Sequence, residues 1–257
     1  MEKVKIQKSW ISKKLLLRMT ILWLAFELIA GVSYKFPVVT IISGIIGMII
    51  FIMLIYFIYA YYVLSPQGGD LQSKISGVVA GKIDKNSSGN LLDIGCGCGI
   101  LSVELAVKCP NLNIQGIDYW SSIWCYSKEK CEQLAKDYNV SERVSFLKAS
   151  ASALPFDDET FDIVISNMVF HKVADAQDKR EVIKEALRVL KKGGQFVFQD
   201  LLLKKKLYGT TDDLVQYIKN TGVESVSFNR LSEEITVPAL LNNAMFFGDT
   251  AMLSGKK

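Results

Sequence analysis

Residues 91–101 read LLDIGCGCGIL, and this stretch decides which fold the chain adopts. Gly95, Gly97 and Gly99 occupy alternate positions directly after a mostly apolar run, Leu91–Ile94. Glycines in such a pattern let the backbone turn tightly and let a ligand approach it closely, because they carry no Cβ. A helical pattern follows over Ile100–Lys108. The stretch is therefore predicted to join a buried strand to the start of a helix.

Strand and helix patterns continue to alternate after this junction. Strands are expected at residues 91–94, 114–117, 144–147, 161–166, 195–198, 223–228 and 246–254. Further helices are expected at 70–83 with Asp70 as the N-cap, at 120–138, and at 179–192 before Gly193-Gly194. This alternation predicts an α/β fold, Rossmann-like and doubly wound, with a mostly parallel seven-stranded sheet.

The glycine stretch also indicates which ligand the sheet binds. Ligands of open parallel sheets bind beyond the carboxyl ends of the strands, where the first strand meets the first helix. Ile100 stands where the dinucleotide fingerprint G-x-G-x-x-G requires its third glycine, which argues against NAD. Asp93 would repel a pyrophosphate but accepts from an ammonium group, and Asp118, at the end of the next strand, suits a ribose diol. These features favour S-adenosylmethionine (SAM), which has an amino-acid end and no phosphate.

Four stretches in succession resemble the motifs of a known family. They are DIGCGCGIL (93–101), GIDYW (116–120), ALPFDDETFDIVISNMVFH (153–171) and LRVLKKGGQFVF (187–198). Together they resemble the class I SAM-dependent methyltransferases, in the small-molecule branch that includes enzymes of ubiquinone and menaquinone biosynthesis. The resemblance covers residues 91–257 and leaves out the apolar N-terminal part.

The resemblance implies roles for individual residues. Cofactor contacts are expected from Asp93, Gly95, Cys96, Gly97, Gly99, Asp118, Tyr119, Ser150, Ala151 and Asn167. Many relatives carry an aspartate where this chain has Ser150, so a neutral hydroxyl would meet the adenine there. His171, the single histidine, is either a general base or part of the pocket wall. Asp162 is expected to order the start of its strand, and Asp200 to line the acceptor side.

The cysteines and tryptophans have simpler interpretations. Cys96 and Cys98 lack a second cysteine pair or a histidine set at zinc-binding spacing, so they are interpreted as loop residues and no metal is expected. Packing roles are expected for Cys109, Cys125 and Cys131, and for the aromatic residues Trp120, Trp124 and Tyr126, which would hold a helix on the sheet.

The N-terminal part differs in composition from the rest. Residues 15–64 are almost entirely apolar, and two helices, about 15–34 and 38–64, are long enough to form a transmembrane hairpin. The expected organisation is a basic N-terminus (1–14), the hairpin (15–64), a linker with an amphipathic helix (65–89) and a methyltransferase domain (90–257). A cleaved signal peptide is the alternative interpretation of the N-terminus.

The charges flanking the hairpin predict its orientation. The first eighteen residues hold Lys3, Lys5, Lys8, Lys13, Lys14 and Arg18, whereas the turn holds only Lys35. Basic flanks stay cytoplasmic, so the catalytic domain is expected in the cytosol, at a plasma membrane of bacterial type. Glu27, inside the first helix, is either functional or merely in contact with the second helix. The hairpin also offers Gly44 and Gly47 for pairing with a second copy.

These observations predict a membrane-anchored SAM-dependent methyltransferase that acts on a small, lipophilic acceptor, with no nucleic-acid partner. The run Lys204-Lys205-Lys206 either touches anionic lipid or forms a solvated face. Two other functions stay open. One is a SAM-binding membrane sensor or scaffold without turnover, and the other is a nucleotide-dependent oxidoreductase.

Overall fold

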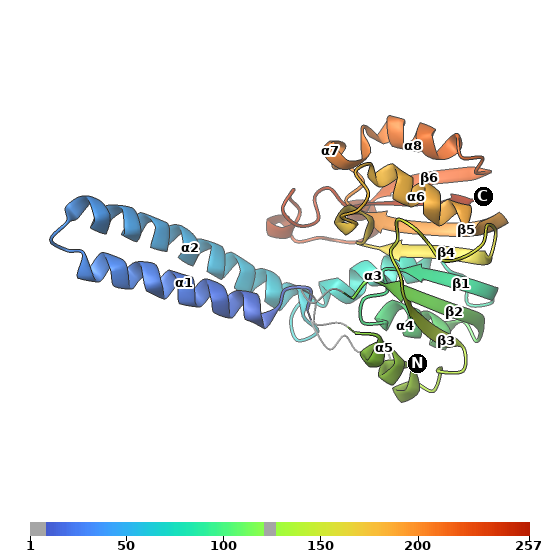
Figure 1. Ribbon diagram of the computed structural model, residues 1–257, viewed down its shortest axis with the longest axis horizontal. Coiled ribbons are helices and arrows are strands. Elements are labelled where there is room, and N and C mark those ends of the chain that lie inside the picture. The colour runs from blue at the N-terminus through green and yellow to red at the C-terminus, as the bar shows by residue number, and fades with distance from the viewer. Residues whose placement is uncertain (1–8, 121–126) are drawn as a thin grey trace. The chain divides into compact units, whose positions relative to one another are not determined.

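The computed structural model describes residues 9–120 and 127–257. The chain forms two compact units, of which one ends at Lys74 and the other runs from Ile75 to Lys257 (Figure 1). The first unit contains the helical hairpin and the second contains the sheet. Each unit is described separately below.

The hairpin consists of α1 (Lys13–Val32) and α2 (Pro37–Leu64), which agree with the predicted helices to within two residues. The hydroxyl of Ser12 accepts from the backbone N–H of Leu15 and caps α1, while Pro37 occupies the first turn of α2. Both helices are long and apolar enough to cross a membrane, a test that a signal sequence or a core helix also passes.

Glu27 lies between the two helices of the hairpin. Its carboxylate accepts from the indole N–H of Trp23 on its own helix, at 3.2 Å. A Cβ added to Gly47 of α2 would lie 2.7 Å from Glu27 Oε1, so Gly47 leaves room for this side chain. Gly44 faces open space within the described part of the chain. The prediction that both glycines are available to pair with a second copy is therefore corrected for Gly47, because the space beside this glycine is filled by Glu27 of the same hairpin.

The second unit contains one seven-stranded sheet in the order β3-β2-β1-β4-β5-β7-β6, in which only β7 runs antiparallel to its neighbours. This confirms the predicted fold class. The strands are β1 (Ser88–Ile94), β2 (Asn111–Asp118), β3 (Val144–Lys148), β4 (Phe161–Asn167), β5 (Leu190–Asp200), β6 (Ser225–Arg230) and β7 (Ala251–Lys256).

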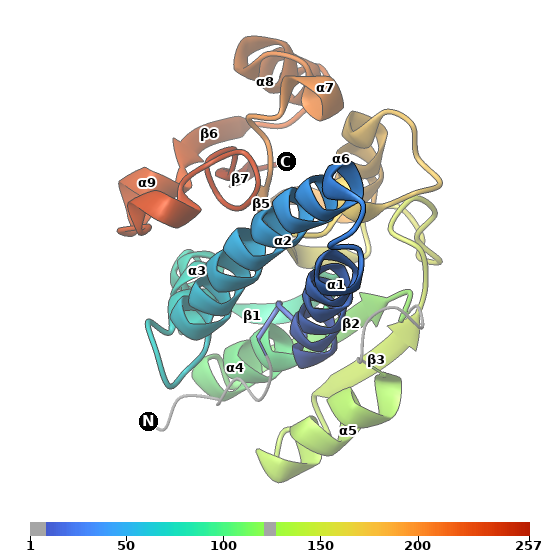
Figure 2. The same ribbon diagram turned by 90° about the vertical axis from the view of Figure 1, so that its left-hand side faces the viewer.

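Helices cover both faces of this sheet. Figure 2 shows α4 (Ile100–Lys108) and α5 (Lys128–Asp137) on one face, and α6 (Lys179–Arg188) and α8 (Thr211–Lys219) on the other. The remaining elements are α3 (Leu71–Gly81), α7 (Lys205–Tyr208), α9 (Leu231–Glu234) and the 3-10 turns η1 (Phe170–Lys172) and η2 (Ala239–Leu241). The parallel arrangement brings the carboxyl ends of β1, β2, β4 and β5 to one edge, where ligands of such sheets bind.

Two predicted helix starts are wrong in detail. The helix predicted over 120–138 begins only at Lys128, where Ser127 caps it, and Trp120 has a left-handed backbone with a φ of 44°. Residues 121–126, including Trp124, Cys125 and Tyr126, lie outside the described residues. Asp70 directly precedes α3, where it was predicted as the N-cap, but its φ is 50° and its carboxylate accepts from the hydroxyl of Ser73.

Two further boundaries differ because strand pairing overrides the local pattern. The helix predicted over 179–192 ends at Arg188, since β5 begins at Leu190, which pairs with Phe161 of β4, and Gly193-Gly194 lies inside this strand. The strand predicted over 246–254 begins at Ala251, opposite Asp200 of β5, and residues 246–250 form turns before it.

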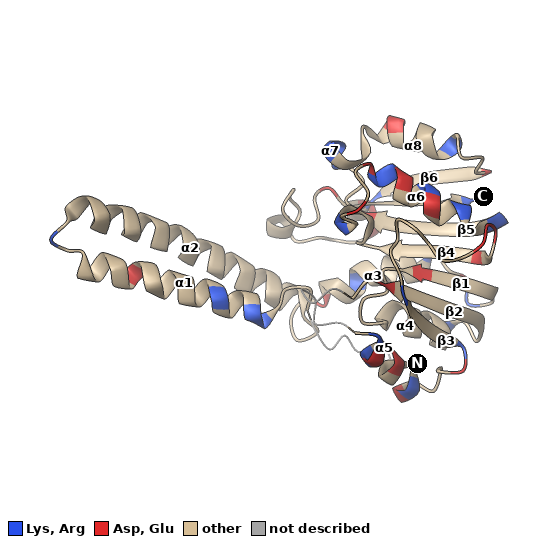
Figure 3. Ribbon diagram, in the orientation of Figure 1, with Lys and Arg blue, Asp and Glu red and all other residues tan. Residues whose placement is uncertain are grey.

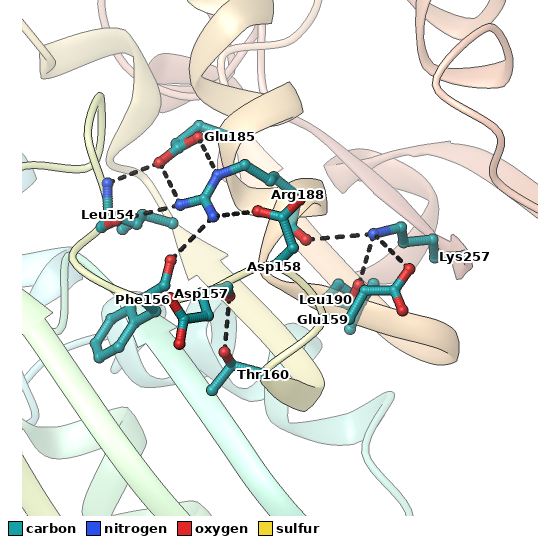
Figure 4. Close-up of polar contacts among 10 residues, drawn as sticks. All are labelled: Leu154, Phe156, Asp157, Asp158, Glu159, Thr160, Glu185, Arg188, Leu190 and Lys257. Carbon is teal, nitrogen blue, oxygen red and sulfur yellow. Dashed lines mark hydrogen bonds and ion pairs between the residues drawn. The ribbon is translucent and has the colours of Figure 1, made fainter.

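The loop before β4 is fixed by Arg188 at the end of α6 (Figure 4). Its guanidinium donates to the carbonyl oxygens of Leu154 (3.2 Å) and Phe156 (2.9 Å). It also pairs with Glu185 at 2.8 Å and with Asp158 at 2.6 Å. The same Glu185 accepts from the backbone N–H of Leu154 at 2.8 Å. A single planar side chain therefore holds this loop in place, because its fork of donors reaches several acceptors at once.

Candidate functional site

The glycine loop joins β1 to α4 as predicted. Gly95, Gly97 and Gly99 all have φ in the left-handed region, at 73°, 59° and 78°. A Cβ on Gly95 would lie 2.2 Å from a methyl carbon of Val169, so this position has no space for a side chain. The backbone N–H groups of Gly95 and Cys96 donate to the Ile117 carbonyl at 2.7 and 2.9 Å, which ties the loop to β2.

Asp118 connects the end of β2 to the glycine loop. One carboxylate oxygen accepts from the backbone N–H of Gly97 at 2.9 Å, and the other accepts from the backbone N–H of Trp120 at 2.8 Å. Each oxygen has capacity for another donor, so a diol could add to these contacts. The indole of Trp120 donates to the Gly97 carbonyl at 2.8 Å. Trp120 therefore packs on the loop and not between a helix and the sheet, which corrects its predicted role.

Asp93 lies beneath the loop and is buried. Its carboxylate accepts from the hydroxyl of Ser102, on α4, at 2.5 Å. The pKa of Asp93 is raised to about 7, chiefly because the carboxyl is buried; the Ser102 hydrogen bond lowers it and the neighbouring Asp118 raises it by smaller amounts. A cation arriving at the loop would favour the ionised form. The predicted partner of an ammonium group is thus present where the loop begins.

Ser150 has a carboxylate beside it that the sequence did not reveal. Asp175, from the loop after η1, accepts from the hydroxyls of Ser150 at 3.0 Å and Ser152 at 2.5 Å. These hydroxyls, Ser152 first, hold the pKa of Asp175 below its ordinary value. Ala151, between them, is buried. Asp175 lies 25 residues after Ser150 in a loop without a motif, so no sequence signal pointed to the pair.

Two other predicted cofactor residues have different surroundings. Tyr119 is exposed, and its ring lies under the ammonium group of Lys148, 5.4 Å from the ring centroid. The amide of Asn167 donates to the hydroxyl of Ser76 at 3.1 Å and accepts from Gln199 at 2.9 Å, so it links α3 to β4 and β5. Their contacts with a cofactor stay predictions.

His171 and Asp200 form a pair at the same edge of the sheet. His171 Nδ1 lies 2.6 Å from Asp200 Oδ1, and the backbone N–H of Leu201 donates to that oxygen at 2.6 Å. Asp200 is fully buried, and the imidazole is 16% exposed. Because the carboxylate accepts the Nδ1 proton, Nε2 is the nitrogen that is free to accept a proton. Asp200 therefore orients the imidazole of His171. The sequence analysis had instead expected Asp200 to line the acceptor side.

Tyr208 lies near Asp200, whereas Asp162 lies at the start of β4. Burial, and then Asp200, raise the pKa of Tyr208. Asp162 accepts from the backbone N–H of Asn90 at 2.8 Å and pairs with Lys191 at 2.7 Å, which confirms that it orders the start of β4.

Among residues 9–120 and 127–257, no group of three or more His, Cys, Asp or Glu side chains is placed to hold a metal ion.

The two cysteines of the glycine loop, Cys96 and Cys98, have thiols whose pKa is raised by burial. Cys96 lies in the loop with its thiol buried, which raises its pKa well above the ordinary value, and burial raises that of Cys98 to about 11. Cys131 donates to the Gly97 carbonyl at 3.3 Å, and Cys109 is buried. Thiols with raised pKa values stay protonated at neutral pH, so Cys96 and Cys98 are neutral residues of the loop.

Comparison with known proteins identifies the class of this domain. Residues 92–198 match the family described as methyltransferase domain. The chain is 30% identical over 161 residues to the 27-O-demethylrifamycin SV methyltransferase of Amycolatopsis mediterranei, which covers 63% of this chain and 56% of that protein. It is 31% identical over 116 residues to the demethylmenaquinone methyltransferase of Bacillus cytotoxicus, covering 45% and 46%. The chain spans about half the length of the curated relatives it matches.

Solved structures share the fold. The [4+2]-cyclase SpnF superposes with a TM-score of 0.55 at 20% identity, over 72% of this chain and 80% of that chain. The YcgJ protein of Bacillus subtilis superposes with a TM-score of 0.50 at 18% identity, over 72% and 99%. The solved structures show the shared fold, and the family match identifies residues 92–198 as similar to the methyltransferase domain family.

The family implies SAM as the methyl donor, and the residues present fit it. The loop holds three glycines with left-handed backbones, and at Gly95 a Cβ has no room. Asp118 offers acceptor capacity for hydroxyls, and Asp93 offers a carboxylate that a cation would ionise. The donor set is therefore suited to a ligand with an ammonium group and a diol.

Proposed function

We propose that this protein transfers a methyl group from SAM to a small, lipophilic acceptor at the cytosolic face of a membrane. The single observation that carries the catalytic part is the contact between His171 and the buried Asp200. The glycine loop and Asp118, at the same edge of the sheet, supply the cofactor part.

The pair His171–Asp200 suits the removal of a proton from the acceptor. When bound, SAM supplies an electrophilic methyl group. His171 Nε2 would take the proton from an acceptor hydroxyl or acidic C–H as the nucleophile attacks that group. Asp200, which accepts from Nδ1, fixes the tautomer and stabilises the imidazolium that forms. The proton then passes from Nε2 to solvent, since the imidazole is partly exposed.

The lipophilic acceptor and the membrane rest on two other observations. One of the similar proteins is a demethylmenaquinone methyltransferase, which supports an acceptor of quinone type. The helices α1 and α2 are long and apolar enough to span a membrane. Only residues 65–70 separate α2 from α3, and even fully extended they reach roughly 20 Å. A chain anchored through α2 would therefore keep its catalytic domain close to the lipid surface.

The proposal is tested with detergent-solubilised full-length protein. SAM turnover to S-adenosylhomocysteine is measured with quinone precursors and lipid extracts, and SAM binding is measured by calorimetry. His171→Gln and Asp200→Asn are expected to lower kcat by about 10²–10⁴-fold while SAM binding changes less than about twofold. Full activity in both variants would exclude the proton-transfer role, and absence of product with every acceptor would exclude the enzymatic function.

A second function is supported by a specific comparison. The [4+2]-cyclase SpnF shares this fold, so the fold alone does not determine methyl transfer. A SAM-binding membrane sensor or scaffold remains the alternative. It predicts micromolar SAM binding, lost in Asp118→Ala, without turnover of any acceptor.

A further inference from the structure

A separate surface lies at the same edge of the sheet as the candidate site. Asp200 of β5 and Arg230 of β6 both pair with Ala251 of β7, so β5 and β6 end at the same edge. The segment from α9 to β7 leaves the sheet there and projects from it, as does the start of α7 (Figure 1). We call Leu240, Met245, Lys205 and Lys206 the edge surface.

The loop that carries Leu240 and Met245 turns other apolar side chains inward. Leu241 and Phe247 are buried beneath the loop, and the backbone N–H of Phe247 donates to the Leu241 carbonyl at 3.0 Å. Leu240 and Met245 instead are 60% and 61% exposed. Among the described residues of the second unit, the other exposed large apolar residues are Tyr119 and Leu147. Two of these four residues, Leu240 and Met245, therefore lie in one loop.

The two basic side chains of the edge surface are exposed as well. Lys205 and Lys206 are exposed at the start of α7 (Figure 3) and form no ion pair within the described residues. Leu203, just before them, donates its backbone N–H to the Asp249 carbonyl at 3.0 Å, which connects this segment to the end of the apolar loop.

The acidic residues of α9 are engaged elsewhere. Glu234 pairs with Lys82 at 2.9 Å, and Glu233 accepts from the backbone N–H of Arg230 at 3.0 Å. Neither glutamate forms an ion pair with Lys205 or Lys206 among the described residues.

We propose that the edge surface binds the interface of a bilayer that contains anionic lipid. Lys205 and Lys206 would meet the headgroups while Leu240 and Met245 bury their side chains at the acyl boundary. Two apolar and two basic side chains are too few for a stable protein interface, which needs about 800 Å² from each partner. These four side chains are enough to bind lipid when a membrane anchor already holds the domain at the bilayer, because the anchor raises the effective concentration of the lipid.

This inference deepens the proposed function and rests on its membrane association. A site that opens at headgroup level would receive a lipophilic acceptor directly from the bilayer. The acceptor would then reach His171 without crossing water, which would otherwise oppose its transfer.

The test uses the full-length protein in lipid nanodiscs, either zwitterionic or containing anionic lipid. Acetylation rates of Lys205 and Lys206 are measured by mass spectrometry, with the exposed Lys192, at the opposite end of β5, as the internal reference. Anionic discs are expected to slow acetylation of Lys205 and Lys206 by about fivefold and to leave Lys192 unchanged. Hydrogen exchange of residues 239–248 is expected to slow in the same discs, and the double variant Leu240→Gln with Met245→Gln should lose this protection.

Several results would overturn the proposal. Equal acetylation of Lys205, Lys206 and Lys192 in both kinds of disc would exclude lipid binding, and protection that persists in detergent would indicate a protein partner instead. Failure of the chain to stay with the discs would refute the spanning helices. The same acetylation and hydrogen-exchange measurements with added anionic vesicles would then test lipid binding by the edge surface separately.

Discussion

Single carboxylates around the glycine loop differ in charge state because their surroundings differ. Asp93 is buried and receives one hydroxyl, and its pKa rises to about 7. Asp175 is exposed and receives two hydroxyls, and its pKa falls. The desolvation of Asp93 outweighs its hydrogen bond, whereas Asp175 has almost no desolvation to offset. One acid is thus poised to respond to a cation, and the other stays ionised.

The pKa of Asp93 predicts that SAM binding releases a proton. At about pH 6 the free protein holds Asp93 mostly protonated, and an ammonium group nearby would lower its pKa, so binding releases up to one proton. At about pH 8.5 the carboxyl is already ionised and no proton is released. SAM affinity should therefore increase as pH rises through about 7, up to the pH at which the amino group of SAM loses its own proton. Calorimetry in buffers of different ionisation enthalpy measures this release.

The matched variant for this experiment is Asp93→Asn, which cannot ionise. It should bind SAM more weakly, with an affinity that does not change over the same pH range. Equal proton release by the parent protein and by Asp93→Asn would place the titrating group elsewhere.

Gly95 and Gly193 provide a second comparison between single residues. Their φ values are 73° and 74°, but a Cβ on Gly95 would lie 2.2 Å from Val169, whereas one on Gly193 would meet nothing within 4 Å. Gly193→Ala should cost about 1–2 kcal/mol of unfolding free energy, from the left-handed backbone alone. Gly95→Ala should cost a further ~1–3 kcal/mol through overpacking and should abolish SAM binding. Thermal unfolding and calorimetry measure both, and equal costs would contradict the steric argument.

At the scale of elements, the order of strands and helices follows from the sequence, but several ends do not. The pattern predicted all seven strands because each apolar run is bounded by turn residues or helical periodicity. The end of α6 was missed because helical periodicity continues past Arg188, while pairing of Leu190 with Phe161 draws the chain into β5. Trp120 was assigned to a helix because the sequence does not show its left-handed backbone or its contact with the distant Gly97, whose carbonyl accepts from the indole.

The connection between α6 and the loop before β4 depends on Arg188. Arg188→Ala removes the donors that hold the carbonyls of Leu154 and Phe156, and should lower the unfolding free energy by about 1–2 kcal/mol. Arg188→Lys keeps the charge without the fork and should recover less than half of this. Asp158 is 75% exposed, so Asp158→Ala should cost less than about 0.5 kcal/mol. Urea denaturation measures the three variants, and a larger loss for Asp158→Ala than for Arg188→Ala would refute this account.

At the scale of the whole molecule, the motifs of the sequence point to the glycine loop and Asp118 of the candidate site, but not to its pairs. The glycine loop and Asp118 belong to motifs that are contiguous in sequence, so their positions follow from the strand order. His171 and Asp200 are 29 residues apart, on segments that follow different strands, and only the folded sheet brings them within 2.6 Å. The contact between Ser150 and Asp175 depends in the same way on a loop that carries no pattern.

The charge distribution along the whole chain predicts how it lies in a membrane. Six basic residues precede position 19 and one lies in the turn between α1 and α2, so both flanks of the hairpin should stay in the cytosol. In a bacterial host, alkaline phosphatase inserted after Lys35 should be active and green fluorescent protein there should be dark, whereas fusions after Lys257 should behave in the opposite way. Phosphatase activity after Lys257 would instead mean export, and N-terminal sequencing would then show whether a signal peptide had been cleaved. Since SAM is made in the cytosol, that outcome would also separate the domain from its methyl donor and exclude the proposed reaction.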